Sequence, residues 1–156
     1  MRRVSISTND LLFSSGANFD TNASFFELLR LMRNKYRIFL ITQVSKDGGA
    51  DHEKAKTELA KLVAAGVVKD HRVMYCSTVE GKKSLVRQLS AELHIETDPS
   101  IVSGLSRFMN KFHLIGTSAT REEASRVGKE NASKVVVFKS ARSYAAKLLP
   151  AFKASS

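Results

Sequence analysis

Short apolar runs alternate with amphipathic segments along the whole chain, and this alternation is typical of a sheet covered by helices. The strongest run, residues 38–41, is continuous and not alternating, so it predicts a strand over 36–44 that is buried on both faces. Weaker runs predict further strands at 4–7, 73–76, 93–95, 112–115 and 134–138.

Helices are predicted between these strands from apolar residues at helical spacing and from capping residues. Ser24, followed by Glu27, has the form of a capping box for a first helix. Asp51 is expected to cap a second helix, and Gly66 to stop it. A last helix over 140–149 is expected to end at Pro150.

Two further helices, at 81–89 and 98–109, follow the third and fourth strands. The first has an apolar stripe that consists of Val79, Leu85, Val86 and Leu89. Its three basic residues, Lys82, Lys83 and Arg87, are expected to lie in water. In the second helix, Asp98 is a good N-cap and Pro99 a good first residue. The predicted buried face of this helix includes Phe108. A shorter helix is predicted at 121–128.

The order of these elements predicts an α/β fold: a Rossmann-like three-layer sandwich with a mostly parallel sheet of about five or six strands and helices on both faces. The sequence shows no linker, repeat or low-complexity segment, so residues 1–156 are expected to form one domain. One cysteine fits a reducing compartment. No apolar run approaches the roughly 18 residues of a membrane span, and no signal peptide is expected at the start.

The net charge of +10 is uneven, because residues 101–156 hold 10 Lys and Arg against 3 Asp and Glu. This asymmetry indicates an acidic partner, a membrane face or nucleic acid, and a merely solubilising surface explains it equally well. Nucleic-acid modules place aromatic side chains among basic ones. Phe138, Tyr144 and Phe152 lie among apolar neighbours instead and are predicted core residues, as is Phe112.

The usual signatures of catalysis are missing. The turn after the first strand lacks the glycines of a dinucleotide site, and no Walker A sequence is present. A haloacid-dehalogenase-type phosphatase needs paired aspartates after the first strand, where this chain offers Asp10, with Thr78 as a possible phosphate-binding hydroxyl. Cys76 is interpreted as a small core residue, and the four histidines have no metal-binding spacing with it. We therefore predict no catalytic set, no cofactor and no metal.

Residues 66–115 carry a more specific signal. The segments VVKD (67–70), VMYCST (73–78), SLVRQL (84–89) and HIETDP (94–99), together with Gly81, resemble the core of the peroxin-22 (peroxisome assembly protein 22) family. The resemblance implies a non-catalytic domain on the cytosolic face of the peroxisomal membrane. Such a domain binds the peroxisomal ubiquitin-conjugating enzyme one to one, tethers and stimulates it, and so supports recycling of import receptors. The family's N-terminal membrane anchor has no counterpart here, so membrane association is expected only through an anchor missing from this sequence.

The helices at 81–89 and 98–109 carry much of this resemblance and several outward basic groups. They predict a partner-binding surface that includes Lys83, Arg87, Gln88, Arg107 and Lys111. An equally good interpretation is that the matching residues are simply core. A degenerate phosphatase, with Asp10 and Thr78 around a metal, and a basic nucleic-acid module, although no nucleic acid is expected as a partner, stay open as alternatives.

Overall fold

The computed structural model describes residues 1–13 and 21–154, and within them the strands form one six-stranded sheet in the order β3-β2-β1-β4-β5-β6. Every neighbouring pair is parallel, which confirms the predicted α/β class and extends it from mostly to wholly parallel. The strands are β1 (Arg2–Ser7), β2 (Tyr36–Gln43), β3 (Val73–Cys76), β4 (Leu93–Glu96), β5 (Phe112–Ile115) and β6 (Val135–Phe138).

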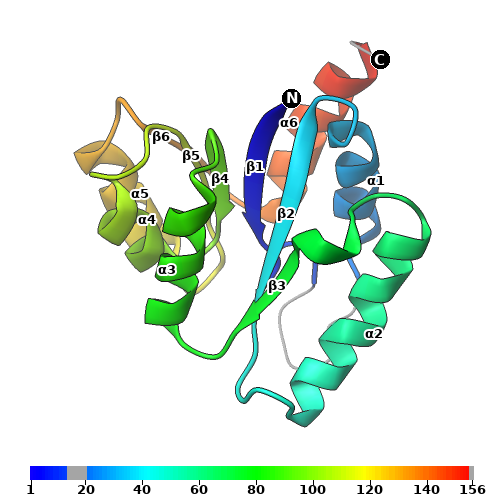
Figure 1. Ribbon diagram of the computed structural model, residues 1–156. Helices are drawn as coiled ribbons and strands as arrows, with labels where there is room; N and C mark the ends of the chain where they lie inside the picture. Colours follow the sequence, from blue (N-terminus) through cyan, green and yellow to red (C-terminus); the bar gives the residue numbers. More distant parts are fainter. Residues whose placement is uncertain (14–20, 155–156) are drawn as a thin grey trace.

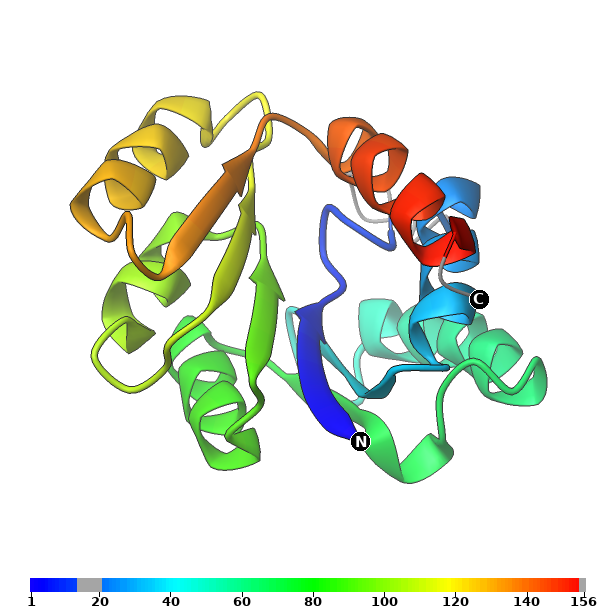
Figure 2. The ribbon, with the colours of Figure 1, turned by 90° about the horizontal axis from the view of Figure 1, so that it is seen from above.

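Helices cover both faces of the sheet, as the sequence predicts (Figure 1). They are α1 (Ala23–Met32), α2 (Ala50–Ala64), α3 (Val79–Leu89), α4 (Pro99–Leu105), α5 (Arg121–Glu130) and α6 (Ala141–Ala154), with a 3-10 turn, η1 (Asp70–Arg72), before β3. Figure 2 shows α3, α4 and α5 on one side and α1, α2 and α6 on the other. In the part of the chain that the structure describes, no helix is long and apolar enough to cross a membrane.

The core is divided between the two faces. Leu40 packs in the cluster beneath α1, α2 and α6, whereas the next residue, Ile41, packs in the cluster beneath α3, α4 and α5. Both side chains are fully buried. The continuous apolar run in β2 therefore has the cause that the sequence indicates, because each face of this strand meets a helical layer.

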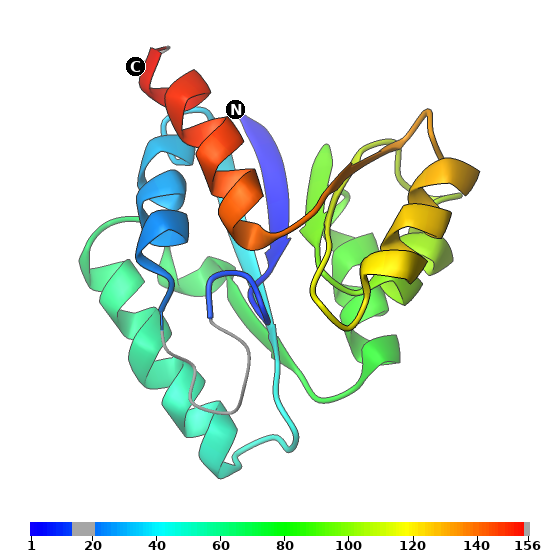
Figure 3. The same cartoon turned by 180° about the vertical axis from the view of Figure 1, so that it is seen from behind.

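The chain returns twice to the middle of the sheet. β1 lies between β2 and β4, so Ile6 is paired with Leu40 on one side and Ile95 on the other. After β6 the chain crosses back over the sheet, and α6 packs beside α1 (Figure 3). Residues that are some 90 positions apart thus become neighbours at the sheet centre.

The N-cap of α1 differs from the predicted one. Asn22 caps the helix, and its Oδ1 accepts hydrogen bonds from the backbone N–H groups of Ser24 at 3.0 Å and Phe25 at 3.2 Å. Glu27 does not return to the cap as a capping box requires and pairs instead with Arg30. The predicted Ser24 cap is wrong because a second good capping residue lies two positions earlier.

Two other predicted helix ends are also wrong. Asp51 lies in the first turn of α2 and not at its cap, and its carboxylate accepts the backbone N–H of Ser45. Pro150 lies inside α6, which continues to Ala154. Leu149 and Phe152, on either side of the proline, pack against the core, and this packing offsets the hydrogen bond that a proline cannot make.

The observed cap of α1 can be tested by mutation. Asn22→Ala is expected to lower the free energy of unfolding by about 1 kcal/mol, because two N–H groups of the first turn lose their acceptor. Ser24→Ala, the matched control, is expected to have little effect, within about 0.5 kcal/mol. Urea unfolding of both variants measures the difference, and a larger loss in Ser24→Ala would contradict the observed cap.

Candidate functional site

The candidate site is a crevice at the carboxyl ends of the central strands. β1 and β4 are adjacent, but the chain leaves β1 toward the α1 face and leaves β4 toward the α4 face. Ligands of open parallel sheets bind at such a switch point. A cavity of about 320 Å³ lies here, and it is lined by Asn9, Asp10, Gln43, Val44, Ser45, Ser77, Lys82, Thr97 and Asp98.

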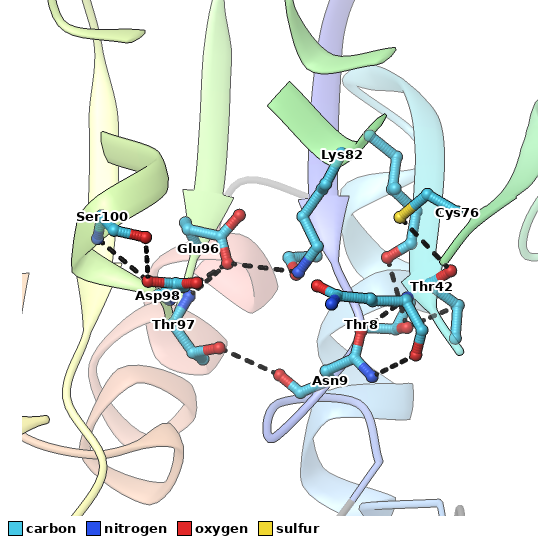
Figure 4. A network of polar contacts seen from close by, with 12 residues as sticks. Thr8, Asn9, Thr42, Cys76, Lys82, Glu96, Thr97, Asp98 and Ser100 are labelled. Atoms are coloured by element: carbon cyan, nitrogen blue, oxygen red, sulfur yellow. Dashed lines mark hydrogen bonds and ion pairs between the residues drawn. The ribbon is translucent and has the colours of Figure 1, made fainter. Parts of the chain in front are cut away.

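The end of β1 is fastened to the end of β2 by side chains. The hydroxyls of Thr8 and Thr42 share a hydrogen bond of 2.6 Å. The Asn9 amide donates to the carbonyl oxygen of Gln43 and accepts its N–H, both at 2.8 Å, as Figure 4 shows in part. In the turn that would carry an aspartate pair in a phosphatase, the neutral side chains of Thr8 and Asn9 join two strands.

Lys82 is the principal residue that the sequence interpretation missed. It was expected in water, but its side chain is 3% exposed and extends from α3 toward the sheet (Figure 4). Its Nζ donates to the hydroxyl of Ser7 at 2.8 Å and lies 3.8 Å from Oε2 of Glu96. A signal was present, because Lys82 follows Val79 by three positions and precedes Val86 by four, which places it on their inward face.

Glu96 is the other half of this buried pair and is fully enclosed. Its carboxylate accepts hydrogen bonds from Nε2 of His94 at 2.9 Å and from the backbone N–H groups of Thr97 at 3.0 Å and Asp98 at 3.1 Å. Burial, the largest single influence, raises the pKa of Glu96. The His94 hydrogen bond, the Lys82 charge and the Asp98 N–H outweigh it, so that the pKa falls to about 2.

These contacts neutralise the crevice from within. The Glu96 carboxylate is surrounded by donors, and the Lys82 ammonium is held by Ser7 and Glu96. The ring of His94 is itself held by the hydroxyl of Ser5, 2.7 Å from its Nδ1. Each of these charged groups has a partner from another element, so the arrangement is suited to holding β1, β4 and α3 together.

The candidate nucleophiles and metal ligands also fail to assemble. Burial raises the pKa of the Cys76 thiol, which packs among apolar residues and donates to the carbonyl of Thr42 at 3.8 Å. Asp10 lines the cavity, but the hydroxyl of Thr78 caps α3 by accepting the Gly81 N–H at 2.9 Å. Among residues 1–13 and 21–154, no three His, Cys, Asp or Glu side chains are grouped as metal ligands. Asp98 is the N-cap of α4, as predicted.

The predicted partner-binding residues fall into two places. Arg87 on α3 stacks on Phe108 at 3.7 Å, and the Arg107 guanidinium lies 5.7 Å from the same ring. Lys83 lies in the seam between α3 and α4, close to Gly104. Gln88 is exposed on α3, in the same place. Lys111 lies apart from the other four, in the lining of a separate cavity beside α6.

Phe108 corrects one prediction. It was expected in the core, but it lies beyond the end of α4 and is 46% exposed. The helix ends at Leu105, four residues earlier than predicted, so the helical spacing that would have turned Phe108 inward stops before it. An exposed aromatic ring with two guanidinium groups near it is therefore the main feature of the α3–α4 surface.

Comparison with known proteins gives a family and a fold. A family model described as "Peroxisome biogenesis protein 22, Haloacid dehydrogenase-like domain" matches residues 2–136. Peroxisome biogenesis protein 22 of Arabidopsis thaliana is 34% identical over 93 residues, which are 59% of this chain and 32% of that protein. The chain thus spans about a third of the length of this relative.

Two solved structures share the fold. The D,D-heptose 1,7-bisphosphate phosphatase of B. bronchiseptica, complexed with magnesium and phosphate, has a TM-score of 0.68 at 9% identity, over 97% of this chain and 99% of that one. The enzyme of the same name from Burkholderia thailandensis has a TM-score of 0.66 at 13% identity, over 96% and 99%. At these identities the likeness shows the architecture alone.

The buried pair predicts a pH-dependent stability. Because the pKa of Glu96 is lowered from 4.5 to about 2, its contribution to the free energy of unfolding is complete above pH 4.5 and is lost as the pH falls toward 2. Glu96→Gln is expected to destabilise the protein by about 3 kcal/mol at neutral pH, since it leaves the Lys82 charge buried and unpaired. It is also expected to flatten the loss of stability below pH 4.5.

Urea unfolding at a series of pH values measures both effects. Glu122→Gln, on the exposed surface of α5, is the control and is expected to keep the wild-type profile. Lys82→Met combined with Glu96→Gln is expected to recover part of the stability, because no unpaired charge then remains in the crevice. A wild-type slope in Glu96→Gln would show that the pair does not carry the acid sensitivity.

Proposed function

Because the chain belongs to the peroxisome biogenesis protein 22 family, we propose that it acts in peroxisome biogenesis as a non-catalytic adaptor for a ubiquitin-conjugating enzyme. In this role it binds the peroxisomal ubiquitin-conjugating enzyme one to one and tethers it at the cytosolic face of the peroxisomal membrane. It also stimulates the bound enzyme, so that import receptors are ubiquitinated and recycled. The transfer cysteine belongs to the partner, and this chain supplies a surface.

The non-catalytic part of this proposal rests on the buried ion pair of Lys82 and Glu96 in the crevice. At the place where an enzyme of this architecture holds its substrate, Lys82 and Glu96 engage each other, and Ser7 accepts a hydrogen bond from the lysine. Ser7 is fully buried, and Cys76 is a weak acid in its apolar surroundings. The side chains that occupy these positions are committed to the fold, which supports a scaffold and not a phosphatase.

The nucleic-acid alternative has less support. Phe138 and Tyr144, two of the five aromatics in residues 101–156, are buried, as the sequence predicts, whereas Phe108 is 46% exposed. The ring centroids of Phe138 and Tyr144 lie 4.6 Å apart, with the planes tilted by 55°, in the core beneath α6. Rings in this position offer no surface on which a base can stack.

The partner surface that we propose is centred on Phe108. Aromatic and arginine side chains contribute most of the binding energy in typical interfaces. Phe108 has Arg87 on one face and Arg107 nearby, so a partner that covers the ring also meets two guanidinium groups. Lys83 and Gln88 lie along the same helix and form the edge of this surface.

Binding to the purified ubiquitin-conjugating enzyme tests this proposal. Phe108→Ala and Arg87→Glu are each expected to weaken binding about tenfold or more, with a nearly unchanged melting temperature, since both side chains are exposed. Lys54→Glu on α2, the same charge reversal on the opposite face, is expected to bind like the wild type. Isothermal titration calorimetry gives the affinities and the stoichiometry.

The two parts of the proposal fail in different ways. Wild-type affinity in both variants would exclude the α3–α4 surface and leave the adaptor role intact. No one-to-one complex with the wild-type chain, together with turnover of a phosphate ester in the presence of magnesium, would reject the adaptor role in favour of the degenerate phosphatase.

A further inference from the structure

A second cavity lies at the opposite end of the sheet from the crevice, where the strands begin. It has a volume of about 370 Å³, within the range of small-molecule sites. The loop between α1 and β2, the segment between α2 and η1, and the start of the chain enclose it. Its lining consists of Met1, Arg33, Asn34, Tyr36, Arg37, Ile38, Gly66, Val67, Val68, Lys69 and Arg72.

Four of these side chains are cations, and they come from separate segments. Arg33 ends α1, Arg37 lies in β2, Lys69 precedes η1, and Arg72 ends η1. Counting charges in blocks along the sequence places the excess in residues 101–156 and misses this cluster. The fold creates it by bringing the α1–β2 loop against the segment after α2.

One of the guanidinium groups is held by hydrogen bonds, and a second lies near an aromatic ring. Nη1 of Arg33 donates to the carbonyl oxygens of Ala65 at 3.3 Å and Gly66 at 3.1 Å, at the C-terminal end of α2. The guanidinium of Arg72 lies 5.6 Å from the centroid of the Phe39 ring. Fixed guanidinium groups lose little further freedom when an anion binds, so they are suited to phosphate.

No acidic side chain balances these charges within the lining. Elsewhere on the described surface, some basic residues pair with acidic ones one helical turn away, as Arg30 does with Glu27 and Lys61 with Glu58. The lining contains no Asp or Glu, and Asp70, which lies between Lys69 and Arg72 in the sequence, is outside it. The carboxylate of Asp70 instead raises the pKa of Tyr75, together with the larger effect of burial.

We propose that this cavity binds a small ligand that carries several phosphate groups, of the size of an inositol phosphate. Four cations around one concave site match several phosphates better than a single anion. Ile38, Val67 and Val68, which pack in the core, form part of the wall and give the cations a rigid support. Such a ligand occurs free in solution or as the headgroup of a phosphoinositide, and both sources present the same chemistry.

The test uses inositol 1,4,5-trisphosphate in solution, vesicles of phosphatidylcholine with phosphatidylinositol 4,5-bisphosphate, and a single-stranded RNA oligonucleotide as competitor. Wild-type protein is expected to bind one inositol trisphosphate per chain, more weakly as salt rises. In the double variant Arg37→Gln, Lys69→Gln the affinity is expected to fall about tenfold or more. Both side chains are exposed and make no ion pair among the described residues.

The control is Lys54→Gln, Lys129→Gln, which removes the same charge from α2 and α5 and is expected to bind within about twofold of the wild type. Binding to the free compound alone, or to the vesicles as well, supports the site and identifies the source. Equal losses in the two double variants would overturn it, since binding would then follow net charge. Displacement by the RNA at equal phosphate concentration, or no saturation at one ligand per chain, would overturn it as well.

Discussion

The structure depends on one buried ion pair at the junction of β1 and β4. Lys82 brings its charge from α3 to Ser7 at the end of β1, and Glu96 meets it from the end of β4. Through Thr97 and Asp98, the same carboxylate also fixes the start of α4. A buried pair of this kind is often less stabilising than an apolar pair of equal volume, but it penalises any arrangement that separates the charges. It therefore specifies how the two halves of the sheet meet.

One architecture can hold different side chains at its strand ends. The phosphatases and the present chain share the fold, whereas the chemistry of a site comes from individual side chains. Here the strand ends carry a neutral clamp, Asn9, and a charge pair that faces inward. The α3–α4 surface exposes Phe108, with the guanidinium groups of Arg87 and Arg107 3.7 Å and 5.7 Å from its ring centroid.

The sequence predicts the strands well because each lies in a short apolar run, and β2 shows its two-sided burial directly. It predicts the chemistry poorly for physical reasons. Lys82 was assigned to water by residue type, although its spacing from Val79 and Val86 places it inward. The pairing of Glu96 with Lys82 has no local signal, because the lysine lies 14 positions earlier in another element. Asn22 and Ser24 are both good caps, so sequence alone does not choose between them.

The position of β1 has a consequence for the order in which the protein forms during synthesis. Among the strands of this sheet, β1 is made first, yet it takes a central position, and one of its edges stays open until β4 has been made. Until then Val4 and Ile6 can pair only with β2, and the ribosome adds residues at about 5–20 per second. The nascent chain thus holds an unpaired central edge for several seconds, during which chaperones or a stray strand can reach it.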